Sequence, residues 1–362
     1  MKWDKIKNFL IVILLVVDVF FAVTLFVQYK SRNYVPGVDL SRLAQLVSDT
    51  IEIPPGVLPA KRQAGIIYGG SYHDDYFESV ASLLSGGQMA SSYVTPDGMS
   101  FVAGGGEMDT YEFTYPFGFR YVHGGAQGAY EIEPEAITQL PEAGFFTSIS
   151  IKNIIKKFLY ADGALNGSGV PSGLRIKLQF GDVRYDASRG LYFTKVAQYV
   201  GGQPIYGCEA VVAVKDSAVV YVSGNLILCN LDESRAMDVL DQVNLMLLEH
   251  RELGGFADAS PSFADGALLA GQNIAETAGQ NAISGNEGGE GAGEPADTAE
   301  TSEYGTAQSG KSRHVLTSAE SCLCIAWYAN RSKFYLLPGW KFVYDGSAVR
   351  VRNSLSGDIY TK

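Results

Sequence analysis

The amino-acid sequence predicts an α+β fold, in which an N-terminal transmembrane helix is followed by tandem modules that each combine a helix with an antiparallel sheet. Three observations predict it. The 362-residue chain opens on one long apolar run. After this run, segments with apolar residues at helical spacing alternate with short aromatic and β-branched runs. The composition agrees, because 21 Tyr and 18 Phe beside 41 Gly favour strands and tight turns.

The predicted membrane anchor covers residues 9–29. From Phe9 to Val27 every residue except Asp18, Ala22 and Thr24 is Leu, Ile, Val or Phe, and about 20 apolar residues cross a bilayer as a helix. No small-x-small cleavage site follows, so we expect the helix to be retained. The positive charges before the run slightly outnumber those after it: Lys2, Lys5, Lys7 and the α-amino group against Lys30 and Arg32. This bias predicts a single-pass cell-membrane protein with a cytoplasmic tip at 1–8 and an extracytoplasmic body.

Asp18 is the costly residue of this anchor, because a carboxylate near the bilayer centre costs about 2.5–3.5 kcal/mol. Such residues usually face a partner or a polar pathway. One acid among apolar neighbours cannot form a conduction path. Two interpretations stay open: Asp18 is protonated and merely tolerated in lipid, or Asp18 and the small Ala22 one turn later bind a partner helix. We favour the partner helix.

The first extracytoplasmic domain is predicted at 37–146. Val38–Thr50 places Leu40, Leu43 and Leu46 at helical spacing, and a second helix is expected over Asp74–Leu84. From Ser91 to His123 the pattern changes to short aromatic runs separated by Gly-rich turns, which predicts a β-meander.

Two further modules repeat the order of helix and sheet. The middle module, 147–231, has a predicted helix at Ser148–Tyr160, followed by these predicted strands: Leu174–Tyr185, Leu191–Tyr199, Ile205–Val214 and Val219–Cys229. The C-terminal module, 232–362, begins with a predicted helix at Asp232–Leu253, whose apolar stripe is Met237, Leu240, Val243, Leu247 and Leu248. Its strands are expected at Ser321–Tyr328, Trp340–Tyr344, Val349–Asn353 and Asp358–Thr361.

An acidic insert at 255–312 interrupts the C-terminal module. In it nine acidic residues stand against Lys311 alone, so it carries eight of the eleven excess negative charges. Its Gly, Ala, Ser, Glu and Thr cannot bury enough apolar surface to offset the entropy of ordering, which predicts disorder. The acidic balance also argues against a nucleic-acid partner, because phosphate binding needs a basic face.

No catalytic constellation is recognisable in the sequence. It lacks Gly-x-Ser-x-Gly, His-Glu-x-x-His, Walker and dinucleotide motifs, and its four histidines are scattered. We therefore predict that the protein is not an enzyme and has no catalytic residue, metal site or cofactor. The cysteines are Cys208, Cys229, Cys322 and Cys324, and buried free thiols are favoured over a Cys208–Cys229 bridge.

Motifs at both ends of the chain resemble one family. Met1-x-Trp3-x-x-x-Lys7 leads directly into the anchor. Near the C-terminus, CIAWYAN with Tyr328 is followed by LLPGWKFVYD with Pro338 and Trp340, and then by VRVRNSLSGDIY with Asn353 and a turn at Gly357. This order resembles the YycH/YycI regulators, Gram-positive membrane proteins that control an essential cell-wall two-component sensor kinase. YycI is closer in size once the acidic insert is discounted. The stretch YVGGQPIYG is similar to the middle repeat of this family and to PepSY-like domains.

The resemblance implies tandem PepSY- or cystatin-like modules and a regulatory, non-enzymatic role. The chain would modulate a sensor histidine kinase that controls cell-wall metabolism, through transmembrane and extracytoplasmic contacts in the lipid membrane. A sister YycH-like regulator is a second implied partner. The anchor of the family more often has a neutral amide where this chain has Asp18.

The residues alone leave two other functions to compare with this one. An extracytoplasmic module that binds a cell-wall polymer or a peptide would suit the Gly-rich loops and the many tyrosines. A pilin-like assembly subunit is disfavoured, because Asn8-Phe9-Leu10 provides neither the processing Gly nor the early Glu of a pilin anchor.

Overall fold

The structure is a computed structural model, and it describes residues 3–71, 75–95, 98–103, 108–125, 128–165, 170–254, 313–327 and 333–360. The predicted insert at 255–312 and the family-motif residue Tyr328 lie outside these ranges. Within them the chain is mixed α/β, with one large and mainly antiparallel sheet and one apolar N-terminal helix. The α+β expectation is therefore confirmed at this coarse level.

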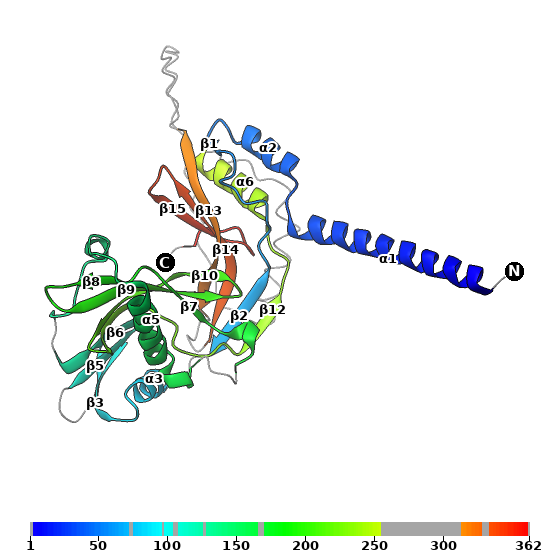
Figure 1. Cartoon of the computed structure of the whole chain (residues 1–362). Helices are drawn as coiled ribbons and strands as arrows, with labels where there is room; N and C mark the ends of the chain where they lie inside the picture. The colour runs from blue at the N-terminus through cyan, green and yellow to red at the C-terminus, as the bar shows by residue number, and fades with distance from the viewer. Residues whose placement is uncertain are drawn as a thin grey trace, which may run out of the picture.

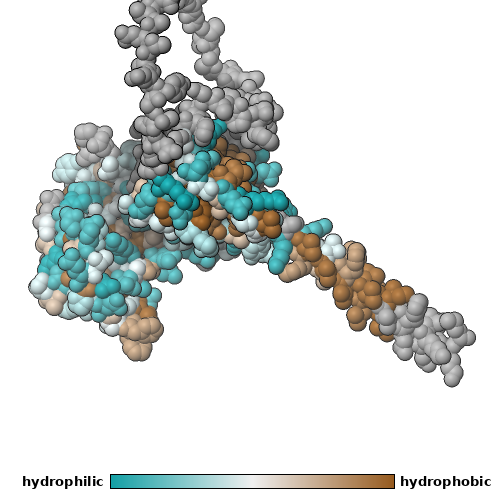
Figure 2. Space-filling model, turned by 90° about the horizontal axis from the view of Figure 1, so that it is seen from above, coloured by the Kyte–Doolittle hydropathy of each residue, from teal (hydrophilic) through white to brown (hydrophobic). Residues whose placement is uncertain are grey.

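Helix α1 (Trp3–Asn33) extends away from the rest of the molecule (Figure 1). Its segment Ile13–Lys30 is long and apolar enough to cross a membrane, and none of it is buried. In Figure 2 this apolar surface is a brown rod beside a body that is mostly teal and white. A membrane anchor and a signal sequence both have these properties.

One part of the sheet, which we call the middle sheet, is antiparallel and runs in the order β3-β4-β5-β6-β11-β10-β9. The strands β7 and β8 both pair with the outer edge of β9. The bounds are β3 Met89–Thr95, β4 Gly98–Ala103, β5 Asp109–Thr114, β6 Gly118–Val122, β7 Lys177–Phe180, β8 Arg184–Asp186, β9 Leu191–Val200, β10 Gln203–Lys215 and β11 Ala218–Asn225.

The other part, the C-terminal sheet, runs in the order β12-β2-β14-β13. The strand β15 pairs with β14, and the short β1 pairs with β13 in parallel. The bounds are β1 Ile51–Glu52, β2 Ile66–Ser71, β12 Glu233–Ala236, β13 His314–Trp327, β14 Lys333–Tyr344 and β15 Ala348–Asn353.

The two parts meet where Ile205 of β10 pairs in parallel with Leu323 of β13. The pairing also crosses the predicted module boundaries. The segment containing β1 and β2 joins strands from the end of the chain, whereas the meander β3–β6 joins β11 of the middle module. Distant pieces of sequence thus share each sheet.

Helices cover these sheets and form the cores. The bounds are α2 Gly37–Leu46, α3 Tyr76–Leu84, α4 Pro134–Ile137, α5 Phe145–Leu159 and α6 Gln242–Leu253, with 3₁₀ turns at His123–Gly125, Ala161–Gly163 and Ser172–Leu174. Helix α5 buries Ile151, Ile155 and Leu159 against the middle sheet. Helices α2 and α6 lie side by side over the C-terminal sheet, in a core that includes Leu245 and Trp340 (Figure 1).

The helix predicted over Asp232–Leu253 is wrong in its first half. Residues 233–236 form the edge strand β12, which pairs with β2, and α6 starts after Asp241, whose carboxylate accepts from the backbone N–H of Asn244 at 3.1 Å. The strand has a partner only because β2 lies beside it, and β2 was not predicted. Met237 and Leu240 of the predicted stripe therefore lie before the helix, and the buried face of α6 is Gln242, Leu245, Met246 and Glu249.

The predicted first helix also ends earlier than expected. It stops at Leu46 rather than Thr50, because Ile51 pairs with His314 as β1. In the described part of the last predicted strand, residues 358–360, Ile359 forms an isolated bridge with Arg352, and Thr361 lies outside the described residues.

Candidate functional site

The predicted partner-binding residues lie on the exposed surface of α1. Asp18 and Ala22 are both exposed, and they lie one turn apart on one face. Leu14 and Leu25 continue this face in both directions at helical spacing. The polar side chain of Thr24 is satisfied within the helix, since its hydroxyl donates to the carbonyl of Phe20 at 2.8 Å. Asp18 has no such intrahelical bond among the contacts of the described residues. Trp3 and Lys7 belong to the first turns of the same helix.

The structure brings the described C-terminal motif residues together on β14 and β15. Pro338 and Gly339 lie at the point where β14 changes its partner from β2 to β15. Trp340, two residues after Pro338, is buried in the core beneath α6. Asn353 ends β15 opposite Gly339. The motif therefore marks one structural unit rather than an exposed site.

The turn after β15 is closed by Asn353 and Gly357. The side-chain oxygen of Asn353 accepts from the N–H of Leu355 at 2.9 Å, and its carbonyl accepts from the N–H of Gly357 at 2.8 Å. Gly357 has φ of 80°, and a Cβ there would meet Leu248 of α6 at 2.5 Å. Glycine suits this left-handed backbone conformation, and a larger residue would also displace the end of the Leu248 side chain.

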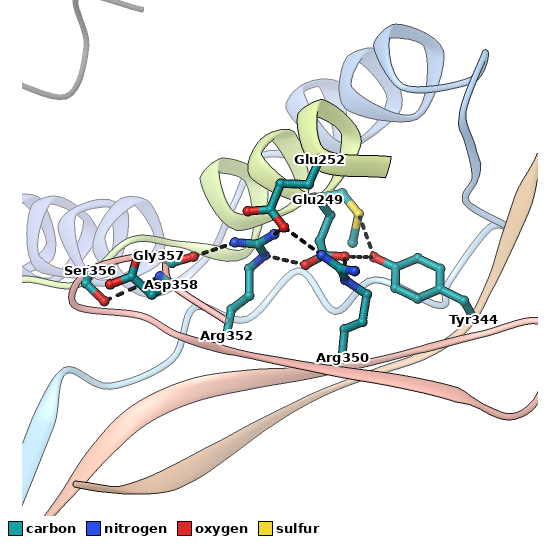
Figure 3. Close-up of polar contacts among 9 residues, drawn as sticks. Glu249, Glu252, Tyr344, Arg350, Arg352, Ser356, Gly357 and Asp358 are labelled. Carbon is teal, nitrogen blue, oxygen red and sulfur yellow. Dashed lines mark hydrogen bonds and ion pairs between the residues drawn. The ribbon is translucent and has the colours of Figure 1, made fainter. Parts of the chain in front are cut away.

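A buried ionic network joins this unit to α6 (Figure 3). Glu249 is fully buried and binds both Arg350, at 2.7 Å, and Arg352. Glu252 binds the same two arginines, each at 2.6 Å. Arg352 also donates to the carbonyl of Gly357 at 2.5 Å, and the hydroxyl of Tyr344 donates to Glu249 at 3.1 Å. The helix is thereby fixed to β14, β15 and the final turn.

The charges of this network are mutually stabilised. Burial by itself lowers the pKa of Arg352, but hydrogen bonds and charges from Glu252 and Glu249 outweigh it and raise that pKa. Burial, together with the charge of Glu249, also raises the pKa of Tyr344. Arg352 therefore stays charged and Tyr344 stays neutral at neutral pH, which indicates a structural role.

Sequence analysis missed this network. One signal was present: Arg350 and Arg352 are two residues apart on a strand and therefore point to the same face. Their partner Glu249 is not among the residues of the predicted apolar stripe.

A second exposed surface lies on α5. Phe145 and Phe146 are 73% and 85% exposed, and their rings touch edge to face with centroids 5.6 Å apart. Ile149, exposed as well, lies one turn further along. The rest of the helix carries Lys152, Lys156 and Lys157 and no acidic residue. We call this surface the aromatic-basic face.

The cysteines are free and buried within the described part of the chain. Cys322 and Cys324 lie on one side of β13 beside Tyr206 and Tyr360. The hydrogen bond from Cys324 and the burial raise the pKa of Cys322, and burial raises the pKa of Cys229 to about 12. Thiols with such pKa values are poor nucleophiles.

Comparison with known proteins gives one family match. The profile of the Fungalysin/Thermolysin Propeptide Motif (FTP) matches residues 177–226, which form the strands β7 to β11. The match includes the strands β10 and β11, on which α5 packs, and a propeptide motif contributes no catalytic residues. No curated protein matches the chain.

Proposed function

We propose that the chain is a non-enzymatic, membrane-anchored regulator that modulates a two-component sensor histidine kinase controlling cell-wall metabolism. In this proposal α1 is an uncleaved anchor with its N-terminus in the cytoplasm, and the body lies outside the membrane. The kinase, and a sister regulator of the YycH type, bind through α1 and through the body. The motifs at both ends of the sequence support this assignment.

The observation that carries the proposal is Asp18. It lies in the segment Ile13–Lys30 of α1, none of which is buried against the body, at a position where a carboxylate is expensive in lipid. A second helix that offers a donor to Asp18 offsets this cost, and the small side chain of Ala22 lets that helix approach closely. A helix that only anchors the chain in the membrane needs neither the carboxylate of Asp18 nor the small side chain of Ala22.

The proposed modular architecture is PepSY- or cystatin-like. In the middle sheet, α5 packs on the strands β10 and β11, and the propeptide-motif match covers these strands. In the C-terminal sheet, α6 packs on β13 and β14. We propose that α5 with the middle sheet derives from one such module and that α6 with the C-terminal sheet derives from another. In this second module, Trp340, Asn353 and Gly357 maintain the structure.

The test is disruption of the contact made by Asp18. An interhelical hydrogen bond in a membrane contributes about 0.6–2 kcal/mol, so Asp18→Leu is expected to weaken association with the kinase roughly 3- to 30-fold. Membrane insertion should improve, since the substitution removes about 3 kcal/mol of insertion cost. The measurement is the yield of kinase cross-linked to the full chain in membranes, divided by the amount of anchored chain.

Two control variants sharpen this test. Asp18→Asn should retain most of the association, because an amide still donates and accepts hydrogen bonds. Thr24→Val removes a hydroxyl already bonded within α1, and should change nothing. Kinase recovery with Asp18→Leu equal to that of the wild type would contradict a role for the anchor in recognition.

The aromatic-basic face of α5 favours a second candidate function, an extracytoplasmic module that binds a cell-wall polymer or a peptide. Exposed aromatic rings and lysines suit an anionic polymer or an acidic peptide. Sedimentation of the full chain with purified cell walls, compared for the wild type and Lys156→Glu, separates the two functions. The regulator proposal expects no sedimentation with either protein.

A further inference from the structure

The path of hydrogen-bonded strands through the sheet ends at β12 on one side and at β3 on the other. A free edge exposes backbone N–H and C=O groups that invite another strand, and proteins usually protect it with charges, proline or short length. The strand β12 is protected, since it has four residues and carries Glu233 and Arg235. The strand β3 has seven residues and contains neither a charge nor a proline.

The surroundings of β3 extend this contrast. No charged residue occurs from Ser79 to Pro96. Among the described strands β3 pairs only with β4, and Tyr93 and Val94 are 59% and 82% exposed. Because consecutive side chains of a strand point to opposite faces, apolar surface is exposed on both sides of this edge. One additional strand would cover both.

We propose that β3 pairs in antiparallel fashion with β3 of a second copy of the chain. The order of its side chains supports self-pairing, since the small Ser91 and Ser92 precede the large Tyr93 and Val94. A twofold axis through Ser92 keeps opposite residues on the same face of the joined sheet and places Ser91 opposite Tyr93 of the second copy. Residues opposite each other have Cβ atoms about 4.5–5.5 Å apart, so the large Tyr93 of each copy meets the small Ser91 of the other.

The alternative arrangements fit less well. Parallel pairing in register would place Tyr93 against Tyr93 and leave the serines against each other. Charge also selects the site of contact: each copy has a net charge of −11, and like charges oppose association. At the uncharged edge formed by β3, two copies can approach without like charges lying opposite each other on the paired strands. The result is a twofold-symmetric dimer in which the two middle sheets become continuous.

The first test is the register of the contact, measured by disulfide cross-linking of the full chain in detergent. Ser91→Cys and Tyr93→Cys are made separately; the native cysteines are buried and do not compete. We expect a disulfide-linked dimer when the two variants are mixed, and little from either variant alone. The matched control mixes Ser234→Cys with Ala236→Cys on β12 and should give no dimer.

The second test is the oligomeric state, measured by sedimentation of the full chain in detergent. Val94→Lys places two like charges in the paired edge and should raise the dissociation constant of the dimer at least tenfold. Ser234→Lys on β12 should leave that constant unchanged. Val94 is exposed, so the variant is expected to fold, and an unchanged near-ultraviolet circular dichroism spectrum verifies this.

Two results would overturn the proposal. One is a wild-type chain that stays monomeric at all concentrations and gives no cross-link in the mixture. The other is a dimer that survives Val94→Lys and lacks the 91–93 cross-link, which would place the contact elsewhere, for instance on α1. Neither result bears on the binding of a kinase through Asp18, so the two proposals fail independently.

Discussion

Glu249 is fully buried, and its charge is neutralised by Arg350 and Arg352 from β15. A buried ion pair need not stabilise a fold relative to apolar side chains, because desolvation is expensive. It does enforce specificity, since any other placement of α6 would leave these charges unpaired. The network therefore fixes one position of the helix over the final turn at Gly357.

At this residue scale we predict that Glu249→Gln lowers the free energy of unfolding by about 3–5 kcal/mol, the usual effect of breaking a buried pair. The reason is that buried Arg352 loses one of its two carboxylate partners. The measurement is denaturant unfolding of the full chain in detergent, followed by tryptophan fluorescence; Trp340 lies in the core beneath α6.

Glu252→Gln is the matched control for this prediction. Glu252 binds the same arginines but is 36% exposed, so the loss should be about 1 kcal/mol or less. Equal losses for the two variants would show that burial does not decide the strength of these pairs.

At the scale of elements, the turn between β8 and β9 depends on one carboxylate, inside the segment that matches the propeptide motif. One oxygen of Asp186 accepts from the backbone and the hydroxyl of Ser188, at 2.9 and 2.6 Å, and the other accepts from Arg189 at 2.6 Å. The hydrogen bonds from Ser188 and then Arg189 lower the pKa of Asp186 from 3.8 to about 2. Arg189 also reaches the carbonyl of Glu131, which ties the turn to the segment before α4.

We predict a pH-dependent effect of Asp186→Asn. Because the pKa is lower in the folded than in the unfolded state, the carboxylate contributes its full stability above about pH 4 and loses it as the pH falls through 2. The variant should therefore melt several degrees below the wild type at pH 6, since about 1 kcal/mol shifts Tm by roughly 2–4 °C. The difference in Tm between the wild type and the variant should decrease as the pH falls from 4 towards 2.

Thermal melts of the full chain between pH 7 and pH 2.5 measure this difference in Tm. Asp182→Asn is the control, because that carboxylate is 71% exposed, and it is expected to change Tm little. A difference in Tm for Asp186→Asn that does not change with pH would contradict an ionic role of the carboxylate.

At the scale of the whole molecule, α1 is attached to the C-terminal sheet and not to the middle sheet (Figure 1). The N–H of Val35 donates to the carbonyl of Ala60 and the N–H of Arg62 donates to that of Asn33, so the end of α1 is held by the segment that leads to β2. If α1 spans a membrane, the C-terminal sheet lies next to it, and the middle sheet, with the aromatic-basic face and β3, extends away.

This arrangement, with the lysines before the apolar run, leads to a topology prediction. External protease added to intact cells should digest the body and leave only a short fragment containing α1, because the lysine distribution predicts a cytoplasmic N-terminus. Immunoblotting with an N-terminal tag gives the fragment size, and permeabilised cells are the control in which the tag is digested as well. Protection of the body from protease in intact cells would indicate the opposite topology, with the body in the cytoplasm.

Local sequence patterns determined the apolar helix, the meander of β3 to β6, the helix α5 and most strands of the last third, because hydropathy and spacing act over a few neighbouring residues. They also singled out Asp18, since the cost of a charge in an apolar run can be judged without knowing the fold. Only the tertiary structure decided that β2 pairs with β14, that residues 233–236 are a strand, that Glu249 is buried and that Pro338, Trp340, Asn353 and Gly357 belong to one unit. An edge strand is stabilised by its neighbour, and a buried charge by its counter-charge, and here those partners lie about 100 or more residues away.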